Sequence, residues 1–144
     1  MQVLTTQRFG VVEYAEQSII RFPWGMPGFE QEKAFLLLRR EAMAPLVFLQ
    51  SVAREDLCFV TLPVGLIDLE YELKLSPEEE QLLGSGDRLC LAVLCVGEQT
   101  SANLLGPIVI AETAGVGLQS IRDDARYSAQ HSVFESGRGE SSCS

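Results

Sequence analysis

The chain has 144 residues, 47% of them hydrophobic, and a formal net charge of −9 with a pI near 4.5. This amount of apolar sequence supports one domain with a hydrophobic core and leaves no room for a second module. The acidic balance argues against nucleic acid and anionic membrane surfaces as partners, because both polyanions are bound through clustered Lys and Arg.

The first eight residues lack the charged and apolar regions of a signal peptide. The longest apolar run, residues 89–96, is far shorter than a membrane span. Cys58, Cys90 and Cys95 lie in apolar runs without CxxC spacing, so we expect buried reduced thiols, whereas Cys143 should be accessible. These features predict a cytoplasmic protein with no membrane association.

Short apolar segments with turn signals between them recur along the first half of the chain. Their lengths are typical of strands, and Gly, Pro or charged clusters separate most of them, which is the pattern of an all-β sandwich or barrel. We predict a mainly β fold: a small antiparallel β-barrel-like single domain with one short α-helix, spanning residues 1–129. The predicted strands in this half are residues 11–14, 18–22, 34–38, 46–49 and 57–62.

The stretch of residues 22–30 contains two prolines, two glycines and three large aromatic residues. Pro27-Gly28 predicts a type II turn, because proline suits its second position and glycine tolerates the positive φ of its third. The aromatic side chains beside such a turn either fold back onto the core or contact a partner. For Phe29 we favour the core.

Residues 68–75 give the clearest alternating pattern in the chain, and we predict a strand there with one apolar and one acidic face. Ser76, Pro77 and Glu79 then form a capping-box sequence, which predicts a helix over residues 77–83 that stops at Gly84. The apolar face of the predicted strand comprises Leu69, Tyr71, Leu73 and Leu75, and the other face Asp68, Glu70, Glu72 and Lys74.

The remaining sequence predicts two strands and a tail. Residues 89–96 are apolar on both faces, as in a central strand, and Pro107 opens a strand at residues 108–110. Gly115-Val-Gly117 lacks the context of a dinucleotide-binding fingerprint and is interpreted as a turn. From Gln130 to residue 144, Ser, Gly and Glu dominate, which predicts a disordered tail.

No arrangement of residues in the sequence indicates catalysis or a cofactor. His131 is the single histidine and lies at the edge of the predicted tail, without the anchoring that a nucleophile–base pair needs. The cysteines and this histidine lack the spacing of a zinc site. We therefore expect no enzyme activity, no metal and no organic cofactor, and a small hydrolase is disfavoured.

Four short motifs, in order, resemble those of the FliW family of flagellar assembly factors. The resemblance covers about residues 9–127. The chain departs from the family pattern at Gly106 and Ala111, where the family more often has Ala and Asn, and by one extra residue near Ser101. The motifs are Ile20-x-Phe22 leading into Gly25-Met-Pro-Gly-Phe-Glu30, then Leu49-Gln-Ser51, then Thr100-Ser-Ala-Asn-Leu-Leu-Gly-Pro-Ile-Val-Ile110, and finally Gly117-x-Gln119 followed by Tyr127.

This resemblance implies a non-enzymatic protein that binds flagellin and the RNA-binding translational regulator CsrA, one at a time, and so controls flagellin synthesis. We expect the chain itself to be monomeric and not to bind nucleic acid directly. Residues 68–80 contain six acidic residues and one Lys, a local charge of −5 that is either a solvated face or a partner site. An unrelated ligand-binding β-barrel is the alternative. The candidate partner-binding residues are Asp68, Glu70, Glu72, Glu78, Glu79, Phe29 and Asn103.

Overall fold

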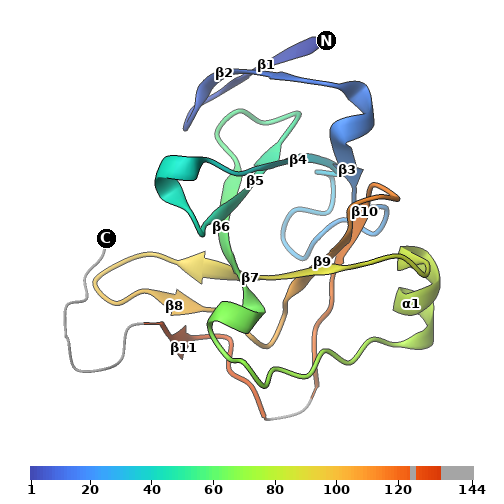
Figure 1. Ribbon diagram of the computed structural model, residues 1–144, viewed down its shortest axis with the longest axis vertical. Coiled ribbons are helices and arrows are strands. Elements are labelled where there is room, and N and C mark those ends of the chain that lie inside the picture. The colour runs from blue at the N-terminus through green and yellow to red at the C-terminus, as the bar shows by residue number, and fades with distance from the viewer. Residues whose placement is uncertain (124–125, 134–144) are drawn as a thin grey trace.

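The computed structural model describes residues 1–123 and 126–133. Seven strands form a closed barrel in the order β7-β6-β5-β4-β3-β10-β9, and a pairing between β7 and β9 completes the ring (Figure 1). All neighbours are antiparallel except β3 and β10, which meet in parallel at a single register pair, Arg21 with Val116. The barrel strands are β3 (Ile19–Arg21), β4 (Ala34–Leu38), β5 (Val47–Ser51), β6 (Cys58–Pro63), β7 (Leu89–Cys95), β9 (Ile108–Ala111) and β10 (Val116–Gln119).

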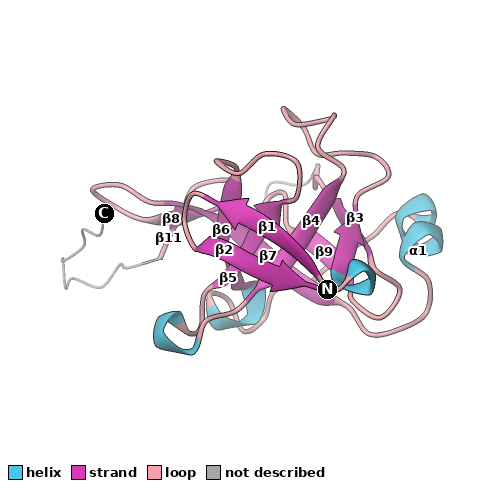
Figure 2. Cartoon of the chain, turned by 90° about the horizontal axis from the view of Figure 1, so that it is seen from above, coloured by secondary structure: helices cyan, strands magenta, loops and turns pink. Residues whose placement is uncertain are grey.

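Within the described part of the chain, four further strands lie outside this ring. β1 (Gln2–Thr6) and β2 (Gly10–Tyr14) form a hairpin that crosses over the barrel, as Figure 2 shows from above. β8 (Ser101–Ala102) pairs with the end of β7, and β11 (His131–Ser132) pairs with β8. The helices are α1 (Pro77–Leu83) and three 3-10 turns, Glu16–Ser18, Glu41–Met43 and Val64–Leu66.

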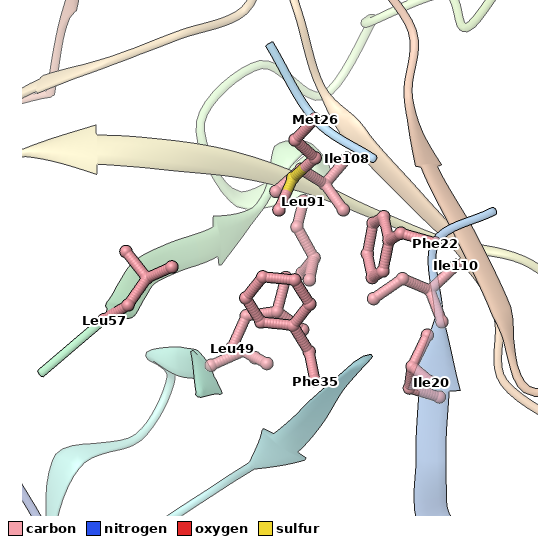
Figure 3. Packing of buried hydrophobic residues seen from close by; sticks show 10 residues of the cluster. Ile20, Phe22, Met26, Phe35, Leu49, Leu57, Leu91, Ile108 and Ile110 are labelled. Carbon is pink, nitrogen blue, oxygen red and sulfur yellow. The ribbon is translucent and has the colours of Figure 1, made fainter. Parts of the chain in front are cut away.

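The barrel interior holds the main hydrophobic core. Phe22, Phe35 and Leu49 are completely buried, and the rings of Phe22 and Phe35 meet edge to face at 5.3 Å between centroids (Figure 3). Alternation along the strands directs these side chains inward, where burial of apolar surface provides the main stabilising free energy. The other residues of this cluster are Ile20, Met26, Val47, Leu57, Leu91, Ile108 and Ile110.

The predicted fold class and the predicted helix are confirmed. The Ser76 side chain accepts a hydrogen bond from the Glu79 N–H at 3.1 Å, and the Glu79 carboxylate accepts one from the Ser76 N–H at 2.9 Å. Helix α1 therefore begins and ends where the sequence predicts, with Gly84 at a positive φ of 81°. A capping box satisfies two donors that a helix start otherwise leaves unpaired.

Several local predictions are wrong. Residues 68–75 do not form a strand; they lie outside the barrel, as a turn at residues 68–71 followed by irregular chain. The interpretation of Gly115-Val-Gly117 as a turn holds only for Gly115, because Val116 and Gly117 begin β10. Cys95 is exposed rather than buried.

The first residues of the predicted tail are hydrogen-bonded to the rest of the chain. His131 and Ser132 pair with β8, and the Val133 N–H donates to the Thr100 carbonyl at 3.1 Å. The rest of the predicted tail, residues 134–144, lies outside the described residues, and so does Cys143.

Candidate functional site

Three of the four sequence motifs meet at one hollow of about 140 Å³ at the barrel, hereafter the motif hollow. The turn after β3 contributes three residues, and the segments around β9 and β10 contribute three more. Phe29 and Asn103, two of the predicted partner-binding residues, therefore lie at the same place although 74 positions separate them. The lining residues are Met26, Pro27, Phe29, Phe59, Val93, Asn103, Ile108 and Gln119.

The turn that carries Phe29 has the predicted type II character. The Phe29 N–H donates to the Met26 carbonyl at 2.7 Å, and Gly28 has a φ of 86°. Gly25 also has a positive φ, 69°, and a Cβ there would lie only 2.7 Å from the Glu30 carbonyl oxygen. Both glycines are thus required by backbone geometry, Gly25 more strictly because the chain passes so close to it.

Phe29 is half-buried and packs on the main core, with its ring edge to face against Phe59 at 5.4 Å. This position agrees with the core interpretation of its ring and leaves part of the ring at the motif hollow.

The two amides of the motif hollow hold loops together. Asn103 accepts hydrogen bonds from the backbone N–H groups of Leu105 and Gly106 at 3.0 and 2.9 Å. Gln119 donates to the Gly106 carbonyl at 2.8 Å. These bonds fix the loop before β9, so Asn103 has a structural role whether or not it also contacts a partner.

The motif hollow is suited to packing rather than to chemistry. None of its lining residues has a titratable side chain. Its volume is well below the range of about 300–1,000 Å³ that is usual for small-molecule sites. It can hold about one apolar side chain, which gives no support to the alternative of a ligand-binding β-barrel.

The acidic candidates lie apart from this hollow, on residues 68–80, hereafter the acidic segment. Tyr71, Leu73 and Leu75 are half-buried and pack on two core clusters outside the barrel lumen. Glu70 and Glu72, between and beside them, are exposed. The alternation seen in the sequence is therefore real at these positions, although no neighbouring strand pairs with them.

An arginine that the sequence did not single out holds the acidic segment in place. The Arg122 guanidinium, in a residue only 8% exposed, lies 5.4 Å from the ring centre of Tyr71 and 4.7 Å from that of Tyr127. It also donates to the carbonyl of Glu72. We call Tyr71, Arg122 and Tyr127 the aromatic clasp.

Two more hydrogen bonds tie the aromatic clasp to its surroundings. The Tyr71 hydroxyl donates to the Leu104 carbonyl at 2.6 Å, and the Glu72 N–H donates to the Tyr127 hydroxyl at 3.0 Å. Burial raises the pKa of Tyr71 to about 12, so this hydroxyl remains a donor well into the alkaline range. The clasp thus joins the acidic segment to the chain after β10.

The five acidic candidates have different surroundings. Glu72 forms an ion pair with Arg126 at 2.9 Å, and Glu79 is committed to the capping box and to a 3.1 Å bond from the Ser120 hydroxyl. Asp68 accepts from the Glu70 N–H at 2.9 Å. Within residues 1–123 and 126–133, no ion pair involves Asp68, Glu70 or Glu78. Of these five candidates, Glu70 and Glu78 are therefore the exposed carboxylates most available to a partner.

Among the residues that the structure describes, no three His, Cys, Asp or Glu side chains are grouped as a metal site would require. No described helix is long and apolar enough to cross a membrane. Cys58, Cys90 and Cys95 are free thiols. Burial raises the pKa of the Cys90 thiol to about 12, far from the lowered pKa of a reactive cysteine.

Known proteins resemble this chain over nearly all of its length. The family model described as FliW protein matches residues 3–133. A flagellar assembly factor FliW from Desulfitobacterium hafniense (strain DSM 10664 / DCB-2) is 36% identical over 137 residues, which are 91% of this chain and 90% of the relative. The chain belongs to the FliW family of flagellar assembly factors.

Other relatives agree with this assignment. A FliW of Leptospira interrogans serogroup Icterohaemorrhagiae serovar copenhageni is 37% identical over 142 residues, 92% of this chain and 93% of the relative. The crystal structure of a flagellar assembly factor FliW superimposes with a TM-score of 0.86 at 34% identity, and covers 93% of this chain and 98% of that one. The FliW barrel is thus shared, and the four sequence motifs identified the family correctly.

Proposed function

We propose that this FliW-family chain acts in the cytoplasm, without catalytic activity, by binding flagellin and the translational regulator CsrA in a mutually exclusive way. Binding of CsrA would prevent it from repressing flagellin messenger RNA, and free flagellin would release CsrA. Flagellin synthesis would then follow the supply of unassembled flagellin. Membership of the FliW family is the observation that carries this proposal.

The surface of the chain supports a cationic partner. The acidic segment has a charge of −5, and Glu70 and Glu78 are exposed and outside the described ion pairs. CsrA must present a cationic surface to hold RNA, since phosphates dominate RNA-binding affinity. An acidic protein bound within the Debye length of about 8 Å would raise the free energy of bringing phosphates to that surface.

The contacts of the acidic side chains decide which of them to change in a test of this idea. Reversal of Glu72 would also break its ion pair with Arg126 and place two cations together, so Glu72 is a poor probe. Glu70→Lys combined with Glu78→Lys changes two exposed carboxylates and leaves the aromatic clasp intact. Exposed changes of this kind alter stability by about 0.5 kcal/mol or less.

The expected result is slower association with CsrA, with a difference from wild type that shrinks as salt rises, because charges at an interface rim act mainly on association rates. The matched control is Glu13→Lys with Glu41→Lys, which changes net charge equally at two exposed sites on other elements. Surface plasmon resonance at low and high salt measures the association rate of CsrA with both double variants. Equal slowing in the two double variants would mean that net charge alone, and not the acidic segment, attracts CsrA.

Binding of flagellin to the same variants completes the test. We expect a smaller effect, because the motif hollow offers a separate apolar contact. A wild-type chain that fails to bind either one of the two proteins would overturn the proposed function.

A further inference from the structure

Leu69 is the most exposed large hydrophobic side chain of the described residues, at 92% exposure, and Leu66 is 61% exposed. The sequence pattern placed Leu69 on the buried face with Tyr71, and the structure contradicts this. Ile67 and Tyr71 on either side of it do pack on the protein. The chain therefore turns Leu69 outward between two anchored neighbours.

A closed hydrogen-bonded turn causes this reversal. The N–H groups of Ile67 and Asp68 both donate to the Val64 carbonyl at 2.9 Å, and the Tyr71 N–H donates to the Asp68 carbonyl at 3.1 Å. The Asp68 carboxylate accepts a hydrogen bond from the Glu70 N–H, which further stabilises the turn. We call residues 66–71 the docking turn.

The docking turn is held at both ends, so its conformation is set before any partner arrives. Its start continues from the 3-10 turn Val64–Leu66, in which Val64 is buried, and its end is Tyr71 of the aromatic clasp. In Figure 1 this stretch follows the short helical turn after β6 and runs away from the arrowhead of β7 toward α1. Such preorganisation lowers the entropy cost of binding, which is a large part of the cost of association.

The charges around Leu69 determine which partner suits it. Asp68 and Glu70 flank the leucine, and neither forms an ion pair among residues 1–123 and 126–133. A second copy of the chain would bring the same charges and a net −9, so self-association at this turn is unfavourable. An anionic membrane is unfavourable for the same reason.

We infer that Leu69 is the apolar anchor through which the docking turn enters a recess, rimmed by Lys and Arg, on CsrA. This inference rests on the proposed function and adds the apolar residue that the charge argument lacks. An apolar centre surrounded by polar or charged contacts is the usual anatomy of a binding hot spot. Leu66 is a second exposed apolar side chain of the docking turn, and Glu70 guides association.

The test compares Leu69→Ser and Leu69→Gln with Leu69→Met, which keeps an apolar side chain of similar size. The control is Val11→Ser on the β1–β2 hairpin, where the valine is also exposed, at 66%. Full-length variants are first checked for unchanged thermal unfolding, which is expected because these side chains are exposed. CsrA binding is then measured by surface plasmon resonance at two salt concentrations.

The polar variants are expected to weaken CsrA binding on the order of 10- to 100-fold, as loss of a buried apolar hot spot does. The change should lie in the dissociation rate and persist at high salt, whereas Glu70→Gln should change mainly the association rate at low salt. Leu69→Met and Val11→Ser should stay within about threefold of wild type, since apolar contact is kept in one and the other lies on a different element.

The outcomes separate the inference from the proposed function. If the wild type binds CsrA and Leu69→Ser binds equally well, the anchor is overturned and the function stands. If the polar variants lose flagellin binding instead, the assignment of the docking turn to CsrA is overturned. If the wild type binds no CsrA at all, the proposed function fails and the inference fails with it.

Discussion

The turn at residues 22–30 and the part of the acidic segment before α1, residues 68–76, both lie outside the regular strands, but different forces hold them. Backbone hydrogen bonds and two positive-φ glycines define the turn, and its first residue, Phe22, is part of the core. The acidic segment before α1 depends on remote side chains, chiefly Arg122 and Tyr127. A locally determined segment can be predicted from its own sequence, whereas a remotely held one cannot.

The largest effect is expected at the core end of the turn. Phe22→Ala should reduce the free energy of unfolding by about 3–5 kcal/mol, because the ring is completely buried against Phe35. Trp24→Ala, in the same turn but half exposed, should cost less than about 1 kcal/mol. Urea unfolding measures both. Similar losses in the two variants would show that the turn is not anchored through Phe22.

The acidic segment should respond next most strongly, and through a residue far away in sequence. Arg122→Met should cost about 2–4 kcal/mol, since it removes a buried charged hydrogen bond and the contacts with two rings. Arg126→Met, which breaks an exposed ion pair with Glu72 and one contact with the Tyr127 ring, should cost less, about 1 kcal/mol. Hydrogen exchange should accelerate at the Tyr71 and Glu72 amides in the first variant. Unchanged exchange there would contradict the role of the aromatic clasp.

Within the turn, the two glycines should differ. Gly25→Ala and Gly28→Ala both force alanine into positive φ, at about 1–2 kcal/mol each. Gly25→Ala adds an overlap with the Glu30 backbone, while a Cβ on Gly28 meets no atom within 4 Å. The free energy of unfolding, measured by thermal unfolding, should therefore be lower for Gly25→Ala than for Gly28→Ala by at least about 1 kcal/mol, since overpacking costs about 1–3 kcal/mol. Equal losses would mean that the chain near Glu30 relaxes freely.

The smallest expected effect concerns the reactivity of the cysteine thiols rather than the free energy of unfolding. In a Cys143→Ser background, a thiol reagent at pH 8 should modify Cys95 first, because it is exposed. Cys90 should be slowest, since burial against the core beside the aromatic clasp raises its pKa to about 12 and leaves almost no thiolate. Mass spectrometry of peptides identifies the order of modification.

The distinction between locally determined and remotely held segments explains what the sequence could and could not predict. The capping box at Ser76, the turn at Pro27-Gly28 and most barrel strands depend on residues a few positions apart, and they were predicted. The strand predicted at residues 68–75 was wrong. Tyr71, Leu73 and Leu75 are partly buried at alternate positions, which gives the sequence pattern of a strand, but no neighbouring strand pairs with this stretch. The barrel closes through β7 and β9 instead.

The candidate site was predictable in part for the same reason. The motifs named Phe29 and Asn103, and the fold brings them to one hollow. The outward turn of Leu69 follows from a hydrogen bond of Asp68 that outweighs simple alternation. Arg122 gave no signal, because its role depends on two tyrosines, one of them 51 positions away.

The parallel contact between β3 and β10 has a consequence for the order of folding. Every other neighbouring pair in the barrel shares three or four register positions, and this one has a single pair. It also joins residues 21 and 116, so its formation closes a long loop at a high entropy cost. The other strands can assemble through nearer neighbours, and docking of β3 against β10 should then be the last step. Gly117 leaves room at this seam for the Phe22 ring, so side-chain packing, more than backbone pairing, completes the barrel.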